Sequence, residues 1–372
     1  MKSKIKKIVK LGLKVLGVVI QTRREMTVLR KAQLKNTVQI DKRKVDLVMV
    51  GCGTMGRSIA QAVKMFPEWQ MLGILDLNEL AVERVKNEIL PSATVATDFD
   101  HLLELLPSGG ILIIATTAKS HEMLFNKAIE KGVKKIFLEK PVATSLAAAN
   151  RMIQLATKNQ VLVNVDHVRR WIAPVEGIKR ILDSGTLGKI HGMHYTFGRS
   201  GFAMIGTHIF DLSRWLFDSD IVKLRGELDD IIRNNWRGAE FIDQSGRCEF
   251  LHENGVRVHL DLSDNLEIQQ DYFVITGSKG RLEVDQRLQT IRLAGGAGRI
   301  WEYPFQWFDS FHNGLSCSLY ELASGKKPKC SLEDGMKALE ATIAVHKSQR
   351  SDNSWVKMPL NGDIVEETFP FA

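Results

Sequence analysis

Short apolar runs alternate with helix-like segments along the first half of the chain, from Val45 onward. Each run is five or six residues long and is bounded by polar or glycine-containing stretches, as buried strands are. The runs predicted as strands cover residues 45–50, 71–76, 93–97, 111–116, 135–139 and 161–165. Helical segments lie between them, including one that ends near Lys64 and one around residues 121–131. Strands that alternate with helices indicate a parallel sheet with crossover helices.

The pattern changes after Trp171. A helix to about residue 184 is followed by longer runs in which apolar and polar residues alternate with a period of two, which is typical of antiparallel strands. These runs are joined by turns with glycine or asparagine and cover residues 190–198, 247–263, 271–285 and 287–296, while further helices are predicted near 208–217, 308–324 and 332–348. We therefore predict an α/β chain with an extension over 1–44, a first domain over 45–166 and a second over 167–372.

Positive charge is concentrated at the start of the chain. The net charge of the 372 residues is +8, but residues 1–44 hold 14 Lys and Arg against two acidic residues, which leaves the remainder at −4. A body of that sign, without a recognisable DNA- or RNA-binding motif, gives no reason to expect a nucleic-acid partner. The four cysteines form no CxxC pair, so we predict no metal site and a cytoplasmic location.

The basic extension contains an apolar run at residues 11–20. This run is too short to span a bilayer, is interrupted by Lys14, and leads into no small-residue cleavage site, so we expect neither a membrane span nor export. Two interpretations stay open: a solvated leader, or a basic helix that makes peripheral contact with the anionic inner face of the membrane.

The clearest motif is Gly51-x-Gly53-x-x-Gly56, which follows a predicted strand and opens a helix. In this context the first glycine permits a tight turn, the second lets a pyrophosphate approach the backbone, and the third lets helix and strand pack closely. Asp76 ends the next strand, where it accepts hydrogen bonds from the adenosine ribose and repels a 2′-phosphate. A Rossmann domain that binds NAD rather than NADP is predicted. The cofactor-binding candidates are Gly51, Gly53, Thr54, Met55, Gly56, Asp76, Thr116, Thr117, Glu139 and Lys140.

Two further motifs supply candidate catalytic residues. Lys140, in the triplet Glu139-Lys140-Pro141, ends the fifth strand at the edge of the sheet where nicotinamide and substrate would lie, and can stabilise charge on a substrate oxygen. His208 and Asp211 share one face of a predicted helix, and a histidine exchanges protons near neutral pH. The alternatives are a solvated loop lysine and a structural histidine.

Substrate-binding candidates follow the sixth strand. The segment DHVRRW places His167 and Arg170 where the chain leaves the first domain, and arginines at a domain cleft suit the carboxylate or phosphate groups of a substrate. An interdomain salt bridge is the equally weighted alternative. Arg199 is a weaker candidate for the same task, and Asp211 completes the predicted substrate-binding set.

Taken in order, GCGTMG, EKP, the histidine of GTHIFDLSRW and the stretch SLEDGMKALEATIAVHKS resemble the glucose-fructose oxidoreductase / inositol dehydrogenase (Gfo/Idh/MocA) family over about residues 45–360. The resemblance implies a second domain with an open, mainly antiparallel sheet and homo-oligomerisation through that sheet. It also implies that Lys140 is the catalytic lysine and that His208 is the proton donor or acceptor. Many members carry Asp where this chain has Met204, which disfavours the sugar-alcohol dehydrogenases and, with the form of the histidine motif, favours a sugar or nucleotide-sugar substrate from surface-polysaccharide metabolism.

The expected activity is hydride transfer between NAD(H) and a secondary alcohol or its ketone. Two alternatives stay open. Some relatives keep a tightly held NAD and use transient oxidation to cleave a glycosidic bond, and a non-enzymatic nucleotide-binding regulator could use the same fold.

Overall fold

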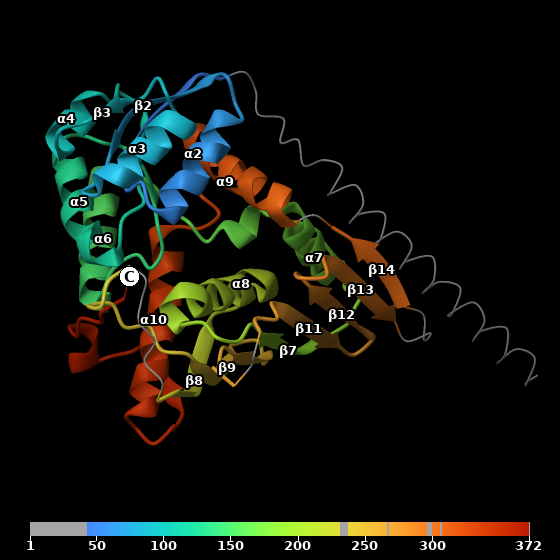
Figure 1. Ribbon diagram of the computed structural model, residues 1–372. Coiled ribbons are helices and arrows are strands. Elements are labelled where there is room, and N and C mark those ends of the chain that lie inside the picture. The colour runs from blue at the N-terminus through green and yellow to red at the C-terminus, as the bar shows by residue number, and fades with distance from the viewer. Residues whose placement is uncertain (1–42, 231–236, 266–267, 296–299, 306, 372) are drawn as a thin grey trace, which may run out of the picture.

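The computed structural model describes residues 43–230, 237–265, 268–295, 300–305 and 307–371. The extension predicted over residues 1–44 lies outside the described residues up to position 42. Two sheets organise the rest of the chain (Figure 1).

The first sheet contains six parallel strands in the order β3-β2-β1-β4-β5-β6. The strands are β1 (Val45–Val50), β2 (Trp69–Leu75), β3 (Thr94–Val95), β4 (Ile111–Ile114), β5 (Lys135–Leu138) and β6 (Leu162–Val165). Because helices cover both faces, the central strands are mostly apolar: β1 carries one charged residue, Asp46, and every residue of β4 is apolar and buried. The order is that of a doubly wound dinucleotide-binding sheet, whose ligand crevice lies at the carboxyl ends of the strands. The predicted parallel sheet is confirmed.

Five helices connect these strands: α2 (Thr54–Lys64), α3 (Glu79–Glu88), α4 (Phe99–Glu104), α5 (Ala118–Glu130) and α6 (Leu146–Asn159). Three of them begin at a polar residue whose side chain accepts a first-turn N–H, namely Asn78, Asp98 and Ser145. Helix α2 differs, because it begins at Gly53 without a side-chain cap and without an acidic residue in its first turn. Its N-terminus therefore keeps donor groups for a ligand.

The second sheet is mixed and mainly antiparallel, in the order β14-β13-β12-β11-β7-β10-β9-β8-β15. Its strands are β7 (Ile190–Thr196), β8 (Ile221–Leu228), β9 (Gly246–His252), β10 (Arg257–Asp261), β11 (Tyr272–Gly277), β12 (Gly280–Asp285), β13 (Thr290–Gly295), β14 (Ile300–Pro304) and β15 (Val356–Lys357). Only the pair β7 and β10 is parallel among these described strands. This arrangement confirms the expected α/β fold with a large second sheet.

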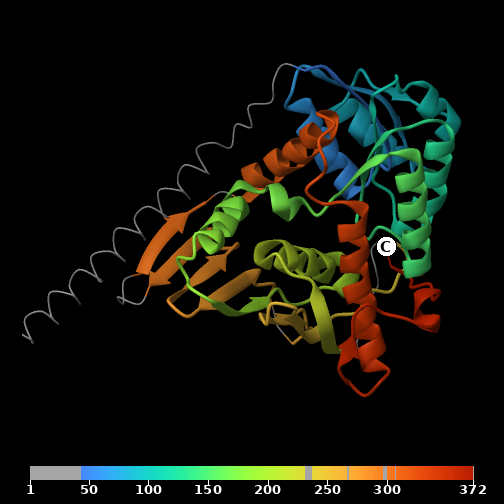
Figure 2. The same cartoon turned by 180° about the vertical axis from the view of Figure 1, so that it is seen from behind.

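The segments η1 (Val168–Trp171) and α7 (Ala173–Asp183) link the two sheets, and η2 (Phe202–Gly206) and α8 (Thr207–Phe217) connect β7 to β8 within the second sheet. Helix α8 lies on the face of the second sheet that is turned toward the first sheet (Figures 1 and 2). The last two helices, α9 (Trp307–Ala323) and α10 (Leu332–Gln349), return to the first sheet: α9 packs against α2, β5 and β6, and α10 packs against α6, α8 and β8. The C-terminal part of the chain therefore contacts both sheets.

Candidate active site

Each of the three glycines in the Gly51-x-Gly53-x-x-Gly56 motif is required for a different geometric reason. Gly51 has φ +100°, and a Cβ there would lie 2.4 Å from the Ala115 carbonyl carbon. A Cβ on Gly56 would lie 2.0 Å from the Gly51 oxygen, so this position needs glycine for close packing. A Cβ on Gly53 would meet nothing within 4 Å, so Gly53 faces open space beside the α2 N-terminus. This combination fits a dinucleotide whose pyrophosphate approaches Gly53 and the first-turn amides of Thr54 and Met55.

Asp76 follows β2 and reaches back to the same turn. Its carboxylate accepts hydrogen bonds from the Cys52 N–H (2.6 Å) and from the Asn78 N–H (2.9 Å). These two bonds fix the carboxylate at the end of the sheet and leave lone pairs for hydroxyl donors. Thr116 and Thr117 follow β4 at the same edge, where the Ser120 hydroxyl donates to Thr116 Oγ1 (2.8 Å). All the predicted cofactor-binding residues therefore lie at the carboxyl ends of β1, β2, β4 and β5.

Lys140 follows β5 and is nearly buried, with 9% of its surface exposed. Its Nζ donates a hydrogen bond to the Met204 carbonyl (2.9 Å), which bridges the first sheet to η2. Burial lowers the pKa of this lysine, and the neighbouring Glu139 opposes that shift. A lysine so placed gives up a proton more readily than a solvated lysine does.

Two histidines lie beside one another at this edge. The rings of His167, after β6, and His208, in the first turn of α8, meet edge to face with centroids 5.3 Å apart. Burial lowers the pKa of His167 to about 4 and holds the pKa of His208 well below its usual range, and the nearby Lys140 adds to both shifts. Both imidazoles are therefore neutral at pH 7, and the same shifts make each of them a weaker base than a solvated histidine.

Buried polar atoms without a hydrogen-bond partner gather around these residues. Among the described residues they include both His167 ring nitrogens and His208 Nδ1, and the Asp166 and Glu139 carboxyl groups beside them have no partner other than each other and the adjacent backbone. Buried polar groups in proteins are nearly always satisfied, so a cluster of unsatisfied ones indicates a place built to contact a ligand. Asp166 also belongs to this set: burial and then the adjacent Glu139 carboxylate raise its pKa well above the usual range.

Asp166 is a site residue that the sequence interpretation missed. It ends β6 as Glu139 ends β5, and its N–H bonds to the Leu138 carbonyl (2.8 Å), so the two carboxyl groups come from neighbouring strand ends. The signal for Asp166 in the sequence is its position directly after a buried apolar strand. The segment DHVRRW predicts substrate contacts only for its histidine and arginine.

Arg170 and Asp211 meet each other. The guanidinium donates to both Asp211 oxygens (2.8 and 2.5 Å) and also contacts Asp334 (3.3 Å) and the Lys329 carbonyl. Both partners of the pair are buried. This bidentate pairing commits the two charges to the packing of η1 against α8 within the second domain, so it is a salt bridge but not the interdomain one of the alternative, and it leaves neither as a free charge for a substrate. Arg199 follows β7 in a left-handed conformation (φ +53°), with its N–H bonded to the Ser263 carbonyl (2.9 Å).

His167, Asp211 and Cys330 carry potential metal-ligating atoms within 4.8 Å of one another. The chemistry of this set does not favour a metal, because Asp211 is already paired with Arg170 and burial raises the pKa of the Cys330 thiol well above its usual value.

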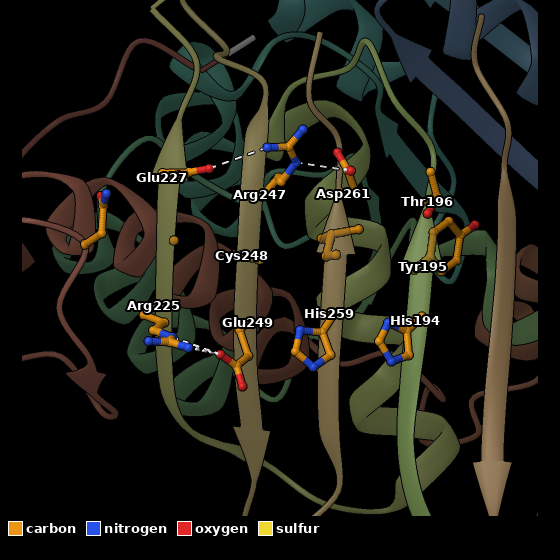
Figure 3. Close-up of a pocket in the computed structure, with 13 residues that line it drawn as sticks. His194, Tyr195, Thr196, Arg225, Glu227, Arg247, Cys248, Glu249, His259 and Asp261 are labelled. Atoms are coloured by element: carbon orange, nitrogen blue, oxygen red, sulfur yellow. Dashed lines mark hydrogen bonds and ion pairs between the residues drawn. The ribbon is translucent and has the colours of Figure 1, made fainter. Parts of the chain in front are cut away.

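A separate groove lies on the second sheet, with a cavity volume of about 520 Å³. Side chains of β7, β8, β9 and β10 line it in two rows (Figure 3). One row contains stacked His194 and His259 rings (centroids 4.6 Å apart), and the other contains Arg247, which bridges Glu227 and Asp261. None of the predicted site residues lines this groove.

Comparison with known proteins places the chain in a family. Residues 45–167 match the family described as oxidoreductases with an NAD-binding Rossmann fold, and residues 175–283 match the GFO/IDH/MocA C-terminal domain. The myo-inositol 2-dehydrogenase of Thermotoga maritima is 26% identical over 326 residues, which cover 82% of this chain and 96% of that protein.

Two solved structures share the fold. Myo-inositol 2-dehydrogenase from Lactobacillus plantarum has a TM-score of 0.70 at 19% identity and covers 85% of this chain and 99% of its own. The WlbA dehydrogenase from Bordetella pertussis, solved with NADH and UDP-GlcNAcA, has a TM-score of 0.69 at 18% identity and covers 86% and 99%. Within the described part of the chain, no helix has the length and apolar character needed to cross a bilayer.

Proposed function

Because this chain belongs to the Gfo/Idh/MocA family of oxidoreductases, which act on CH–OH groups, we propose that it is an NAD-dependent dehydrogenase or reductase of a sugar or nucleotide-sugar secondary alcohol. The observation that carries the proposal is the cluster of unsatisfied buried groups around Lys140, His167 and His208. It lies at the carboxyl edge of the sheet whose glycine turn suits a dinucleotide.

NAD held by the glycine turn and by Asp76 supplies the hydride acceptor or donor. Lys140 Nζ donates a hydrogen bond to the substrate oxygen and stabilises the negative charge that develops there. His208, neutral at pH 7, accepts the hydroxyl proton when an alcohol is oxidised and returns it when a ketone is reduced. Glu139 and Asp166 lie at neighbouring strand ends beside Lys140 and would offer further hydrogen-bonding groups to substrate hydroxyls.

Three relatives suggest two classes of substrate. Those named myo-inositol dehydrogenases act on a cyclic polyol, and WlbA was solved with a nucleotide sugar. Many family members carry Asp at the position of Met204. The methionine therefore favours a nucleotide sugar over a sugar alcohol as the substrate of this chain. NAD is the favoured cofactor because the Asp76 carboxylate opposes a 2′-phosphate.

The test is a screen of the full chain with NAD against myo-inositol, simple sugars, UDP-sugars with and without a carboxylate, and glycosides, followed by the absorbance of the reduced cofactor. Net NAD reduction with a sugar or nucleotide sugar supports the proposal. Cleavage of a glycoside at constant NAD would instead identify the glycoside-cleaving alternative, and no turnover of any member by the wild-type chain would contradict both.

We also propose that the chain forms a homo-oligomer through the open face of the second sheet. The charged and histidine rows on β7 to β10 supply polar groups of both signs on that face. Light scattering coupled to size-exclusion chromatography tests this, and a monomeric mass across the micromolar range would rule it out.

A further inference from the structure

The helix that carries His208 begins with a cap supplied from a distant part of the chain. The helical segments η2 and α8 form one continuous helix that begins at Phe202. The residue before it is Gly201, which has no side chain to cap the helix. Instead, the Phe202 N–H bonds to the Gln244 carbonyl (3.2 Å), and the N–H groups of Ala203 and Met204 bond to the Asp243 carboxylate (2.8 and 2.7 Å). All three donors of the first turn are therefore satisfied by two residues some 40 positions further along the chain.

The cap is built into the local packing. A Cβ on Gly201 would lie 2.0 Å from the Asp243 carboxyl carbon, so the position beneath the carboxylate has room only for glycine. The capping segment is held from both sides, because the Ile242 N–H bonds to the Pro370 carbonyl (2.8 Å) and the Ser245 hydroxyl bonds to Asp229 (2.8 Å).

This capped turn contacts the catalytic lysine directly. The carbonyl of Met204, whose own N–H is held by Asp243, accepts the hydrogen bond from Lys140 Nζ. His208 follows Met204 by four residues, about one helical turn, on the same continuous helix. One carboxylate thus fixes the peptide that orients the lysine and the helix that presents the histidine.

We propose that Asp243 is a positioning residue for the reaction, which holds Lys140 and His208 in their mutual geometry through the first turn of the helix without contacting the substrate. The inference rests on the proposed function, because it takes Lys140 and His208 as the groups that act on the substrate.

The ionisation of Asp243 links this arrangement to pH. Burial raises its pKa to about 6, while the two backbone N–H groups and the positive charges of Lys140 and Arg237 oppose that rise. Only the ionised carboxylate accepts both N–H groups with its two oxygens, so the cap weakens as the pH falls through about 6. The pKa of His167 lies near 4 and that of His208 lies well below its usual range, so neither gives an acidic limb near pH 6. Asp166, whose pKa is also raised, is the second group that could titrate on this limb, and the pH profile of Asp243→Asn separates the two because Asp166 is intact in that variant.

The test compares Asp243→Asn with Glu240→Gln. Asparagine has nearly the same shape as aspartate but presents an NH2 group to one of the two N–H donors. The control removes the same charge from an exposed residue three positions earlier. The assays use NAD with the best-turned-over member of the panel above, with a UDP-sugar as the first probe, and hydrogen exchange of peptides that cover residues 202–206.

We expect Asp243→Asn to lower kcat by roughly 10- to 100-fold, since a displacement of about 1 Å costs that much, while the dissociation constant for NAD stays within about twofold. The acidic limb of its pH profile near pH 6 disappears, and exchange at residues 202–206 becomes faster. Glu240→Gln behaves as the wild-type protein in all four measurements.

Wild-type kcat in Asp243→Asn, or an unchanged acidic limb, overturns the positioning role, and unchanged exchange overturns the cap itself. Failure of the proposed function gives a different pattern: Lys140→Ala turns over normally, while Asp243→Asn still shows faster exchange at residues 202–206. That pattern also overturns the catalytic part of the inference and leaves Asp243 as a helix cap only.

Discussion

Alanine substitutions at two glycines of the fingerprint should separate folding from cofactor binding. At Gly56, the added Cβ would lie 2.0 Å from the Gly51 oxygen, which is a backbone atom and cannot turn aside. Such overpacking costs about 1–3 kcal/mol of unfolding free energy. At Gly53, the Cβ would meet nothing within 4 Å, and the backbone there has φ −67°, which alanine adopts freely.

The expected change in stability for Gly53→Ala is therefore below about 1 kcal/mol, because the entropic gain of Gly→Ala opposes the poorer N-cap. NAD affinity should nevertheless fall at least tenfold, about 1.4 kcal/mol, because the methyl group stands where the pyrophosphate approaches the α2 N-terminus. Gly56→Ala should lower both the melting temperature and the NAD affinity.

Thermal unfolding without cofactor and calorimetric titration with NAD measure the two effects separately. NAD binding by Gly53→Ala at wild-type affinity would refute the placement of the pyrophosphate at this turn. A Gly56→Ala protein as stable as wild type would refute the close approach of α2 to the Gly51 carbonyl.

Three further predictions concern chemistry, cofactor choice and the extension. Lys140→Ala and His208→Ala should each lower kcat by about 10²–10⁴ with little change in the dissociation constant of NAD, and normal turnover in both variants would move the active site elsewhere. Titration with both cofactors should show tighter binding of NAD than NADP, and Asp76→Ala should narrow that difference; equal affinities in the wild type would exclude Asp76 as the discriminating group. Deleting residues 1–44 should spare turnover but abolish salt-sensitive co-sedimentation with anionic vesicles, and full-length protein that stays in the supernatant at low salt would leave the extension without a membrane role.

The first sheet was predictable because its signals are local. Each strand is a short apolar run, and β1 and β5 begin at the predicted residues, since a strand buried on both faces has no alternation to confuse its limits. Strand β8 (Ile221–Leu228) was missed. Its sequence IVKLRGEL does alternate, since Lys223, Arg225 and Glu227 fall between apolar or glycine positions, but Gly226 and the register shift between Ile221 and Lys223 weaken this signal.

The residues of the candidate site also fall into a predictable and an unpredictable group. Residues that end parallel strands, such as Asp76 and Lys140, were predictable because the topology brings all carboxyl ends of a parallel sheet to one edge. Asp243 was not predictable, since it lies in a segment without a strand or helix signal, and its task depends on where that segment returns in space. Short-range patterns locate residues on elements but not contacts between distant loops.

The arginine and aspartate that the sequence marks as substrate candidates have a role in placing the two histidines. Asp211 lies three residues after His208 on α8, and Arg170 lies three residues after His167, so their bidentate pair ties the two histidine-bearing segments together. Asp334, in the first turn of α10, contacts Arg170 as well (3.3 Å) and thereby fixes that helix to the same point. Removing one partner of a buried ion pair leaves an uncompensated charge and costs about 3–5 kcal/mol, more than most single contacts contribute. The buried Arg170–Asp211 pair can therefore contribute to catalysis although it does not touch the substrate. It fixes the distance between the two imidazoles as part of the fold.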